Sequence, residues 1–204
     1  TTFGTAASSS AFTSTGGTGS ITWSVAKTSD GSAVSGVTIN SSGVVTASNS
    51  TTAGTYSMTV TATDTVGATG TKAMTVTVSQ ANQTLTLTAG STTIPYYGTT
   101  SITASAYSGT GVITYTVGSG CSLSSGTLTV MTSSSTCTVS ATIASDTNYN
   151  SANSNTLTIT RTKADLTITA TASSSTKIYG ASNPTFSFST TGLKNSEKIG
   201  RAHV

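Results

Sequence analysis

Residues 56–63 have the sequence Tyr-Ser-Met-Thr-Val-Thr-Ala-Thr, in which apolar and hydroxylated side chains alternate over eight positions. Residues 74–78, Met-Thr-Val-Thr-Val, continue the same alternation. Because successive side chains of a strand point to opposite faces, the pattern places the apolar side chains on one face and the threonines on the other. Residues 64–67, Asp-Thr-Val-Gly, separate the two runs and favour a turn. The region therefore predicts an antiparallel β-hairpin with one buried face.

Strand patterns of this kind extend along the whole chain, and no segment shows helical periodicity. Further strands are predicted at 21–25, 85–89, 101–106, 112–117, 127–130, 136–143, 156–160, 166–170 and 185–189. Short strands separated by Gly, Ser and Asn turns at intervals of about 8–12 residues are typical of sandwiches and barrels. We therefore predict an all-β fold built of sandwiches or barrels.

The composition is dominated by hydroxylated residues, with 50 Thr and 37 Ser among 204 residues. Charged residues make up only 6% of the chain and the net charge is +3, which argues against a nucleic-acid partner. No apolar run approaches the roughly 18 residues needed to span a bilayer, so we expect no membrane insertion. The chain begins at Thr1 without Met or a signal peptide, which we interpret as a fragment whose natural start lies upstream.

An internal repeat indicates the modular organisation. Residues 85–89, Leu-Thr-Leu-Thr-Ala, recur as Leu-Thr-Ile-Thr-Ala at 166–170, and the Tyr-Gly pair at 97–98 recurs at 179–180. The offset of 81 to 82 residues matches a whole small sandwich. We therefore predict one module over 1–80, a second over 81–162 and an incomplete third over 163–197.

The last six residues, Ile-Gly-Arg-Ala-His-Val at 199–204, resemble the translation of a common short-read sequencing adapter. We therefore expect 198–204 to be a non-native tail and exclude it from the fold. His203 is the only histidine of the chain, so the remaining sequence contains none.

Each module carries motifs of a known family. The segments Gly-Gly-Thr-Gly-Ser-Ile-Thr-Trp-Ser-Val at 16–25 and Thr-Ala-Gly-Thr-Tyr at 52–56 resemble the cadherin-like Ig domain of bacterial surface proteins. Residues 137–141 and 146–152 are similar to bacterial Ig-like repeats of large extracellular proteins. Residues 164–170, with Lys-Ile-Tyr-Gly at 177–180, are similar to the start of the MBG domain of bacterial adhesins. Together with the repeat, these resemblances imply an all-β fold of tandem immunoglobulin-like antiparallel β-sandwiches, the last one truncated. They also imply surface or secreted proteins and no catalytic site.

Few residues of the chain are candidates for catalysis. Nucleophilic catalysis needs a base beside Ser or Cys, and histidine is absent outside the tail, although a Ser–Lys pair formed only in space stays open. A pair of carboxylates for glycoside hydrolysis would come from acids scattered over three modules: Asp30, Asp64, Asp146, Asp165 and Glu197. We therefore predict no catalytic residues, no cofactor and no enzyme activity.

The loop Asp146-x-Asn148-x-Asn150 has the opening spacing of a calcium loop. Ser151 and Leu157 replace the Gly and Glu that an EF-hand requires at its sixth and twelfth positions. We therefore predict an Asx-stabilised turn with Tyr149 packed inward and no metal ligands, while calcium at a module junction stays open.

The two cysteines, Cys121 and Cys137, fall within the second predicted module. Turns at 124–126 and 132–136 can return them to neighbouring strands, within the roughly 7 Å between Cα atoms that a bridge requires. We therefore predict a Cys121–Cys137 disulfide, which fits an oxidising compartment. The alternative is that the two are small buried hydrophobic side chains that stay unpaired.

The leading hypothesis is a non-catalytic structural or adhesive repeat segment of a large secreted or cell-surface bacterial protein, with neighbouring repeats and an unidentified protein or glycan ligand as partners. The alternative is a spacer or carbohydrate-binding accessory array of a secreted polysaccharide-degrading enzyme. Trp23, the only tryptophan, could stack on a sugar, but a lone Trp in such a strand is more often part of the core. Both hypotheses predict an extracellular location.

Overall fold

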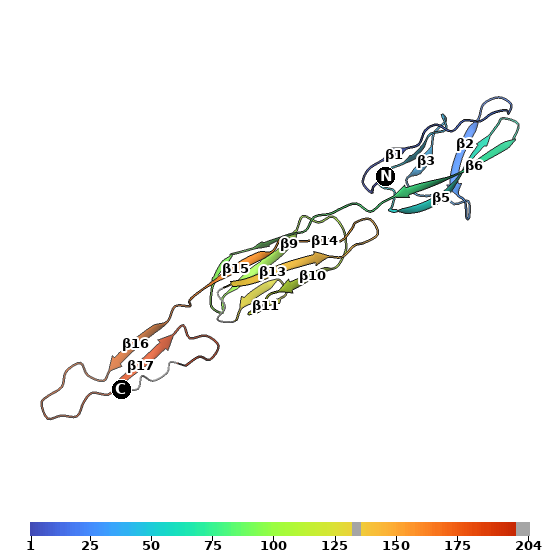
Figure 1. Cartoon of the computed structure of the whole chain (residues 1–204). Coiled ribbons are helices and arrows are strands. Elements are labelled where there is room, and N and C mark those ends of the chain that lie inside the picture. Colours follow the sequence, from blue (N-terminus) through green and yellow to red (C-terminus); the bar gives the residue numbers. More distant parts are fainter. Residues whose placement is uncertain (132–135, 199–204) are drawn as a thin grey trace. The chain divides into compact units, whose positions relative to one another are not determined.

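The protein is an all-β chain in the computed structural model, which describes residues 1–131 and 136–198 (Figure 1). Every regular element in that part is a strand, which confirms the predicted fold class. Over the same residues there is no helix that could cross a membrane. The adapter-like residues 199–204 and most of the predicted turn at 132–136 lie outside the described residues.

The chain divides into two compact units. The first consists of Thr1–Leu85, Ala106–Thr114 and Thr142–Asn153, and the second consists of Thr86–Ser105, Tyr115–Ala141 and the chain from Ser154 onward. The predicted module boundaries near residues 80 and 162 stay predictions.

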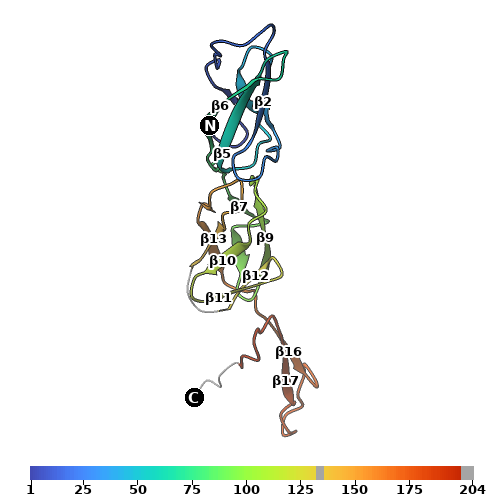
Figure 2. The ribbon, with the colours of Figure 1, turned by 90° about the vertical axis from the view of Figure 1, so that its right-hand side faces the viewer.

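The first sandwich lies in the first unit and has two three-stranded sheets, in the orders β1-β4-β3 and β2-β5-β6. Its strands are β1 (Ala7–Ser8), β2 (Thr22–Lys27), β3 (Val37–Ile39), β4 (Val45–Ala47), β5 (Gly54–Thr63) and β6 (Thr69–Val78). The predicted hairpin is β5–β6, which pairs without interruption from Gly54–Val78 to Thr63–Thr69 (Figure 2).

The alternating sequence of the hairpin explains the core of this sandwich. Met58 and Val60 on β5 are fully buried, and Val76 and Val78 on β6 lie on the same face. They pack with Val34, Val37, Val45 and Ala47. Full burial of a Val or Met side chain stabilises a fold by about 1.5–3 kcal/mol, so a few such residues hold the two sheets together.

The second sandwich is formed by strands β7 to β15. They are β7 (Thr86–Ala89), β8 (Thr93–Pro95), β9 (Thr99–Ser105), β10 (Ile113–Val117), β11 (Cys121–Ser124), β12 (Thr127–Val130), β13 (Thr136–Ile143), β14 (Ala152–Asn153) and β15 (Leu157–Thr162). One sheet has the order β11-β12-β9-β7 and the other β10-β13-β15-β8, with β14 beside β13. Its buried side chains include Leu87, Ile102, Leu128, Val130, Val139 and Ile159.

This arrangement is the immunoglobulin topology, in which strands A, B, E and D form one sheet and C, F and G form the other. Here β7, β9, β12 and β11 take the first set of places, and β10, β13 and β15 take the second. The first sandwich repeats it, since β1-β4-β3 corresponds to B-E-D and β2-β5-β6 to C-F-G. Both sandwiches are therefore Ig-like.

One strand pair departs from the predicted antiparallel pairing. The first strand of the second sandwich changes sheets, and its continuation β8 pairs in parallel with β15. Because seven strands alternate in direction, the first and the seventh run the same way and must be parallel where they meet. An isolated parallel bridge, Thr2–Ser79, occupies the same place in the first sandwich.

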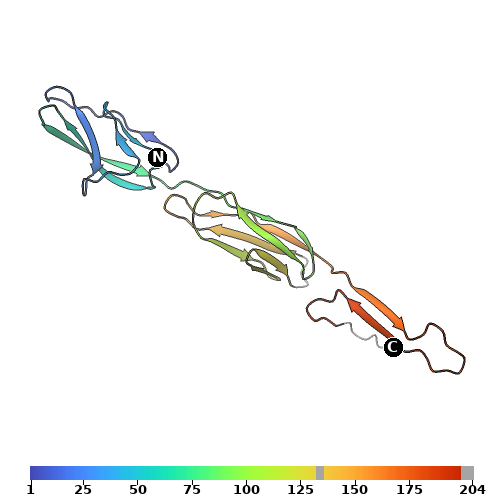
Figure 3. The same cartoon turned by 180° about the vertical axis from the view of Figure 1, so that it is seen from behind.

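The last element is a two-stranded hairpin, β16 (Thr167–Ala172) with β17 (Phe186–Thr191), in the orange-red part of the chain (Figure 3). One of its faces carries Ile168, Phe186 and Phe188, which are 56%, 75% and 68% exposed. Two strands cannot enclose an apolar face, so this face is left exposed. That the hairpin belongs to a truncated sandwich stays a prediction.

Candidate functional site

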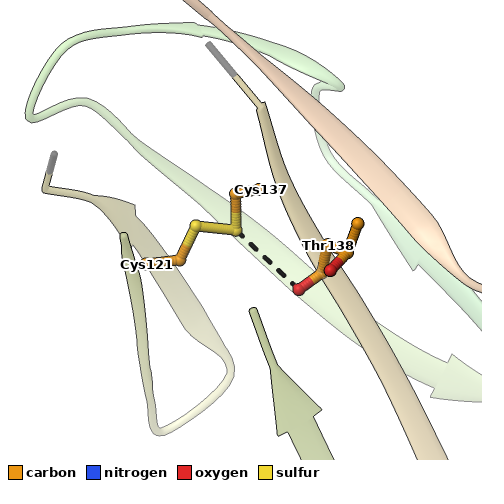
Figure 4. Close-up of a disulfide and its surroundings, with 3 residues drawn as sticks. All are labelled: Cys121, Cys137 and Thr138. Carbon is orange, nitrogen blue, oxygen red and sulfur yellow. Dashed lines mark hydrogen bonds between the residues drawn. A yellow bond between two sulfur atoms is a disulfide. The ribbon is translucent and has the colours of Figure 1, made fainter. Parts of the chain in front are cut away.

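The two cysteines are joined in a disulfide that links the two sheets of the second sandwich (Figure 4). Cys121 lies on β11 and Cys137 on β13, with their Cα atoms 6.1 Å apart. The prediction of neighbouring strands is wrong in this respect, because β11 and β13 belong to different sheets. The short sequence separation misled that prediction, since a chain can change sheets within one connection.

The disulfide is a core element and presents no reactive group. The Cys137 side chain is 2% exposed and Cys121 is half-buried. The Cys137 sulfur lies 3.9 Å from the Thr138 backbone oxygen. A disulfide sulfur carries no hydrogen, so this approach is a van der Waals contact.

The Asp146 carboxylate organises the loop between β13 and β14. One oxygen, Oδ1, accepts hydrogen bonds from the backbone N–H groups of Asn148 and Tyr149, each at 2.8 Å. The other, Oδ2, accepts the backbone N–H of Thr110 at 2.6 Å and the Thr110 hydroxyl at 3.2 Å. The N–H groups of Thr110, Asn148 and Tyr149 favour the ionised carboxylate and lower its pKa. The structure thus contains the predicted Asx turn.

Asp64 has the same role in the first sandwich. Its Oδ2 accepts the backbone N–H of Thr18 at 2.9 Å, and its Oδ1 accepts those of Val66 and Ala68 at 3.0 and 2.8 Å. These bonds, led by the one from Thr18, lower the pKa of Asp64, whose side chain is 8% exposed. Asp64 and Asp146 each connect the turn after the F strand to the loop before the C strand.

The sequence indicates this equivalence through a second internal repeat, which is separate from the repeat described above. Residues 17–25, Gly-Thr-Gly-Ser-Ile-Thr-Trp-Ser-Val, match residues 109–117, Gly-Thr-Gly-Val-Ile-Thr-Tyr-Thr-Val. Thr18 and Thr110, the donors to the two aspartates, occupy the same position of this motif.

The residues after Asp146 contact the start of the chain within the first unit. The Ala53 N–H donates to Asn148 Oδ1 at 3.0 Å, and the Phe3 and Tyr149 rings meet edge to face at 5.5 Å. Ala81 exchanges backbone hydrogen bonds with this loop, from its N–H to the Asn148 oxygen and from the Asn150 N–H to its own oxygen. Tyr149 is half-buried, in line with its predicted inward packing.

The polar side chains of this loop make turn and loop contacts. Both Asp146 oxygens and the Asn148 Oδ1 already accept hydrogen bonds, and the Asn150 side chain donates to Asn82 Oδ1 at 2.8 Å. Within residues 1–131 and 136–198 no group of three or more metal-ligating side chains converges.

The Trp23 side chain lies at the boundary between the core and the surface of the first sandwich. It packs against the buried cluster of the first sandwich, as predicted, and the Gly43 Cα faces its indole so closely that a side chain there would meet the ring at 3.2 Å. It also lines a surface groove together with Phe12, Thr71 and Lys72. Two aromatic side chains beside hydroxyl and ammonium donors form a surface on which a sugar ring could stack.

The outward face of the β2-β5-β6 sheet is mostly hydroxylated and is uncharged. The outward positions of β2, β5 and β6 hold Thr22, Ser24, Ala26, Thr55, Ser57, Thr59, Thr61, Thr63, Thr69, Thr71, Ala73, Thr75 and Thr77. Such a face stays soluble through hydroxyl groups and offers hydrogen-bond donors and acceptors without charge. It contains no acid or base for catalysis.

The topology thus defines an Ig-like chain whose described surface holds turn-forming aspartates, a Trp-lined groove and hydroxylated sheets. The chain is similar to several solved Ig-containing structures, although each global superposition is loose. Murine CEACAM1b aligns with 14% identity over 71% of this chain and 86% of its own, with a TM-score of 0.35. The Ig1-2 module of the Drosophila receptor tyrosine phosphatase DLAR aligns with 17% identity over 70% and 83%, with a TM-score of 0.29.

The final hairpin has its own match. Residues 166–203 match the family described as the MBG domain of the YGX type.

The surface layer protein SbsC, domains 1-6, aligns with 13% identity over 81% of this chain and 27% of its own, with a TM-score of 0.25. No curated protein sequence matched the chain.

Proposed function

We propose that this chain is a non-catalytic structural or adhesive segment of a large secreted or cell-surface bacterial protein. Two sandwiches of one topology followed by an MBG-type segment support a repetitive array. The disulfide supports an extracellular location, because such bonds persist in oxidising compartments.

The observation that carries the proposal is the bonded connection between residues 80–83 and the Asp146 loop. Gln83 donates to the Asn150 oxygen of this loop at 2.8 Å, and it also accepts the N–H of Gly109, in the loop before β10, at 2.9 Å. Such a connection, with Ala53 and Phe3 bound to the same loop, resists separation of segments under tension. Load bearing is what a stalk requires, and catalysis does not need it.

Mechanical unfolding of single molecules tests this function. Tyr149→Ala removes the ring that contacts Phe3, and we expect it to lower the force at which the first unit opens. Tyr179→Ala is the matched control, because Tyr179 is fully exposed. Equal unfolding forces for the two variants would contradict the load-bearing role, as would hydrolysis of a polysaccharide or ester that one substitution in the described residues abolishes.

The alternative, a carbohydrate-binding accessory module, is favoured by the groove of Phe12, Trp23 and Lys72. Trp23 is the only tryptophan, so its fluorescence reports on this groove alone. Titration with soluble oligosaccharides should leave the emission unchanged if the segment is purely structural. A saturable change that is absent in titrations with simple polyols would favour the carbohydrate-binding function.

A further inference from the structure

The strand β10 forms the edge of its sheet. The sheet has the order β10-β13-β15-β8, so β13 is the one neighbour of β10 among the described strands (Figure 1). The Gly118 N–H, just after β10, donates to the Thr138 oxygen of β13 at 2.8 Å. Because the backbone groups of a paired strand alternate in direction, the even-numbered residues of β10 face β13 in the same way. The backbone N–H and C=O groups that point away from the sheet therefore belong to Ile113, Tyr115 and Val117.

The equivalent edge of the first sandwich is covered at its end. There β2 takes the place of β10, since Ile-Thr-Trp-Ser-Val at 21–25 matches Ile-Thr-Tyr-Thr-Val at 113–117. The Lys27 N–H donates to the Ser32 oxygen at 2.8 Å, and the Gly31 N–H donates to the Lys27 oxygen at 3.0 Å. A covering loop and a lysine are two of the means by which proteins protect a strand edge.

The β10 edge lacks this protection in the part of the chain that the structure describes. Residues 113–117 contain no charge and no Pro, and they consist of residue types that favour strands. The central side chain, Tyr115, is 36% exposed. An uncharged edge of this kind is a template for pairing with a further strand.

The sequence of β10 is self-complementary about Tyr115. Read in either direction, it places an aliphatic residue, a threonine, the tyrosine, a threonine and an aliphatic residue. Two such strands that meet antiparallel, with Tyr115 opposite its copy, therefore pair Ile113 with Val117 and Thr114 with Thr116. The residues whose backbone groups point away from the sheet then lie opposite one another, so these pairs can exchange both hydrogen bonds.

Charge does not oppose such a contact between identical surfaces. Residues 73–160 contain a single charged residue, Asp146, whose carboxylate is bound by the backbone of its own loop and by Thr110. Net charge ordinarily keeps identical proteins apart, and a surface without charge loses that repulsion.

We propose that the β10 edge is a homotypic interaction site, and that its partner is β10 of a second copy of this chain. The two copies are related by a two-fold axis at Tyr115, as an interface made of the same patch on both copies requires. The two sheets become continuous across the axis, with the tyrosines on one face and the threonines on the other.

The test uses the full chain and places charges at the contact. In the variant Thr114→Lys/Thr116→Lys, lysines of the two copies lie directly opposite each other, which destabilises a strand pair. Both threonines are exposed in the single copy, so the fold should be unaffected. The dimer dissociation constant, measured by analytical ultracentrifugation, should increase at least about tenfold. The matched control, Thr103→Lys/Thr158→Lys, adds the same charge at exposed positions of other strands and should dimerise like the wild type.

A variant of opposite charge distinguishes this edge from other surfaces. Thr114→Glu/Thr116→Glu should also be monomeric alone, and mixing it with the lysine variant should restore a dimer. In the wild type, amide exchange at Tyr115 should slow as the protein concentration rises, because its N–H becomes bonded in the dimer, whereas exchange at Lys27 should not change.

Dimers of the wild type, their loss in both charged variants and their return in the mixture would support the proposal. A wild type that stays monomeric at its highest soluble concentration, or exchange at Tyr115 that is independent of concentration, would overturn it. Dimers that persist in the lysine variant would also overturn it, because another surface, such as the exposed face of β16–β17, would then carry the association. A mixture of the two charged variants that stays monomeric would have the same consequence.

Discussion

Replacement of the disulfide should destabilise the second sandwich by about 3 kcal/mol. The bond joins cysteines 16 positions apart in the sequence, and the chain-entropy relation gives about 3 kcal/mol for a closed loop of that size. For a domain of this length, 1 kcal/mol lowers the melting temperature by about 4–8 °C, so the expected decrease is about 12–24 °C.

The substitutions follow from burial at the two positions. Cys137→Ala suits the buried position, where a serine hydroxyl would lack a partner, and Cys121→Ser suits the half-buried position. The double variant and the wild type are melted with and without reductant. Reductant should lower the wild-type transition to that of the variant and should leave the variant unchanged. Two titratable thiols in unfolded, oxidatively prepared wild type, or a wild-type transition that reductant does not move, would refute the reasoning.

Three further predictions concern the rest of the chain. Met58→Ala should cost about 3 kcal/mol of stability in urea unfolding because Met58 is fully buried, whereas Met131→Ala, at an exposed position, should cost little; similar losses would contradict the assigned core. The hydrogen bonds that lower the pKa values of Asp64 and Asp146 stabilise the fold fully above the ordinary value of 3.8, and this stabilisation is lost as pH falls below it. Acid titration of a double Asn variant should therefore show a weaker dependence of stability on pH in that range. An unchanged profile would contradict the two turns. A chain that ends at Thr162 should melt no lower than the whole fragment, since the β16–β17 hairpin leaves its apolar face exposed; a lower transition by calorimetry would give the hairpin a stabilising role.

Regular alternation made the long strands predictable. The predicted strands at 127–130 and 136–143 coincide with β12 and β13, and the hairpin at 56–78 is β5–β6 with longer arms. The short strands β3 and β4 were not predicted, because each offers only three residues, too few for a period-two pattern. Pairing between distant edges, such as β8 with β15, has no local signature at all.

The chemistry of the loops was predictable in part. The Asx turn at Asp146 followed from its residue types, since carboxylates accept local N–H groups readily. The hydrogen bond from Ala53 to Asn148 joins residues 95 positions apart, and neither residue type predicts such a contact.

The central claim, that the chain is a load-bearing series of folded Ig-like sandwiches, is tested most directly by pulling single molecules from both ends before and after reduction. Under oxidising conditions the account predicts separate unfolding events for the two sandwiches. Reduction should lengthen the second sandwich's event by about 50 Å, because the 16 residue steps closed by the disulfide then extend at about 3.3–3.6 Å each in place of the 6.1 Å between the linked Cα atoms. Extension without force peaks, or contour lengths that reduction leaves unchanged, would contradict the account.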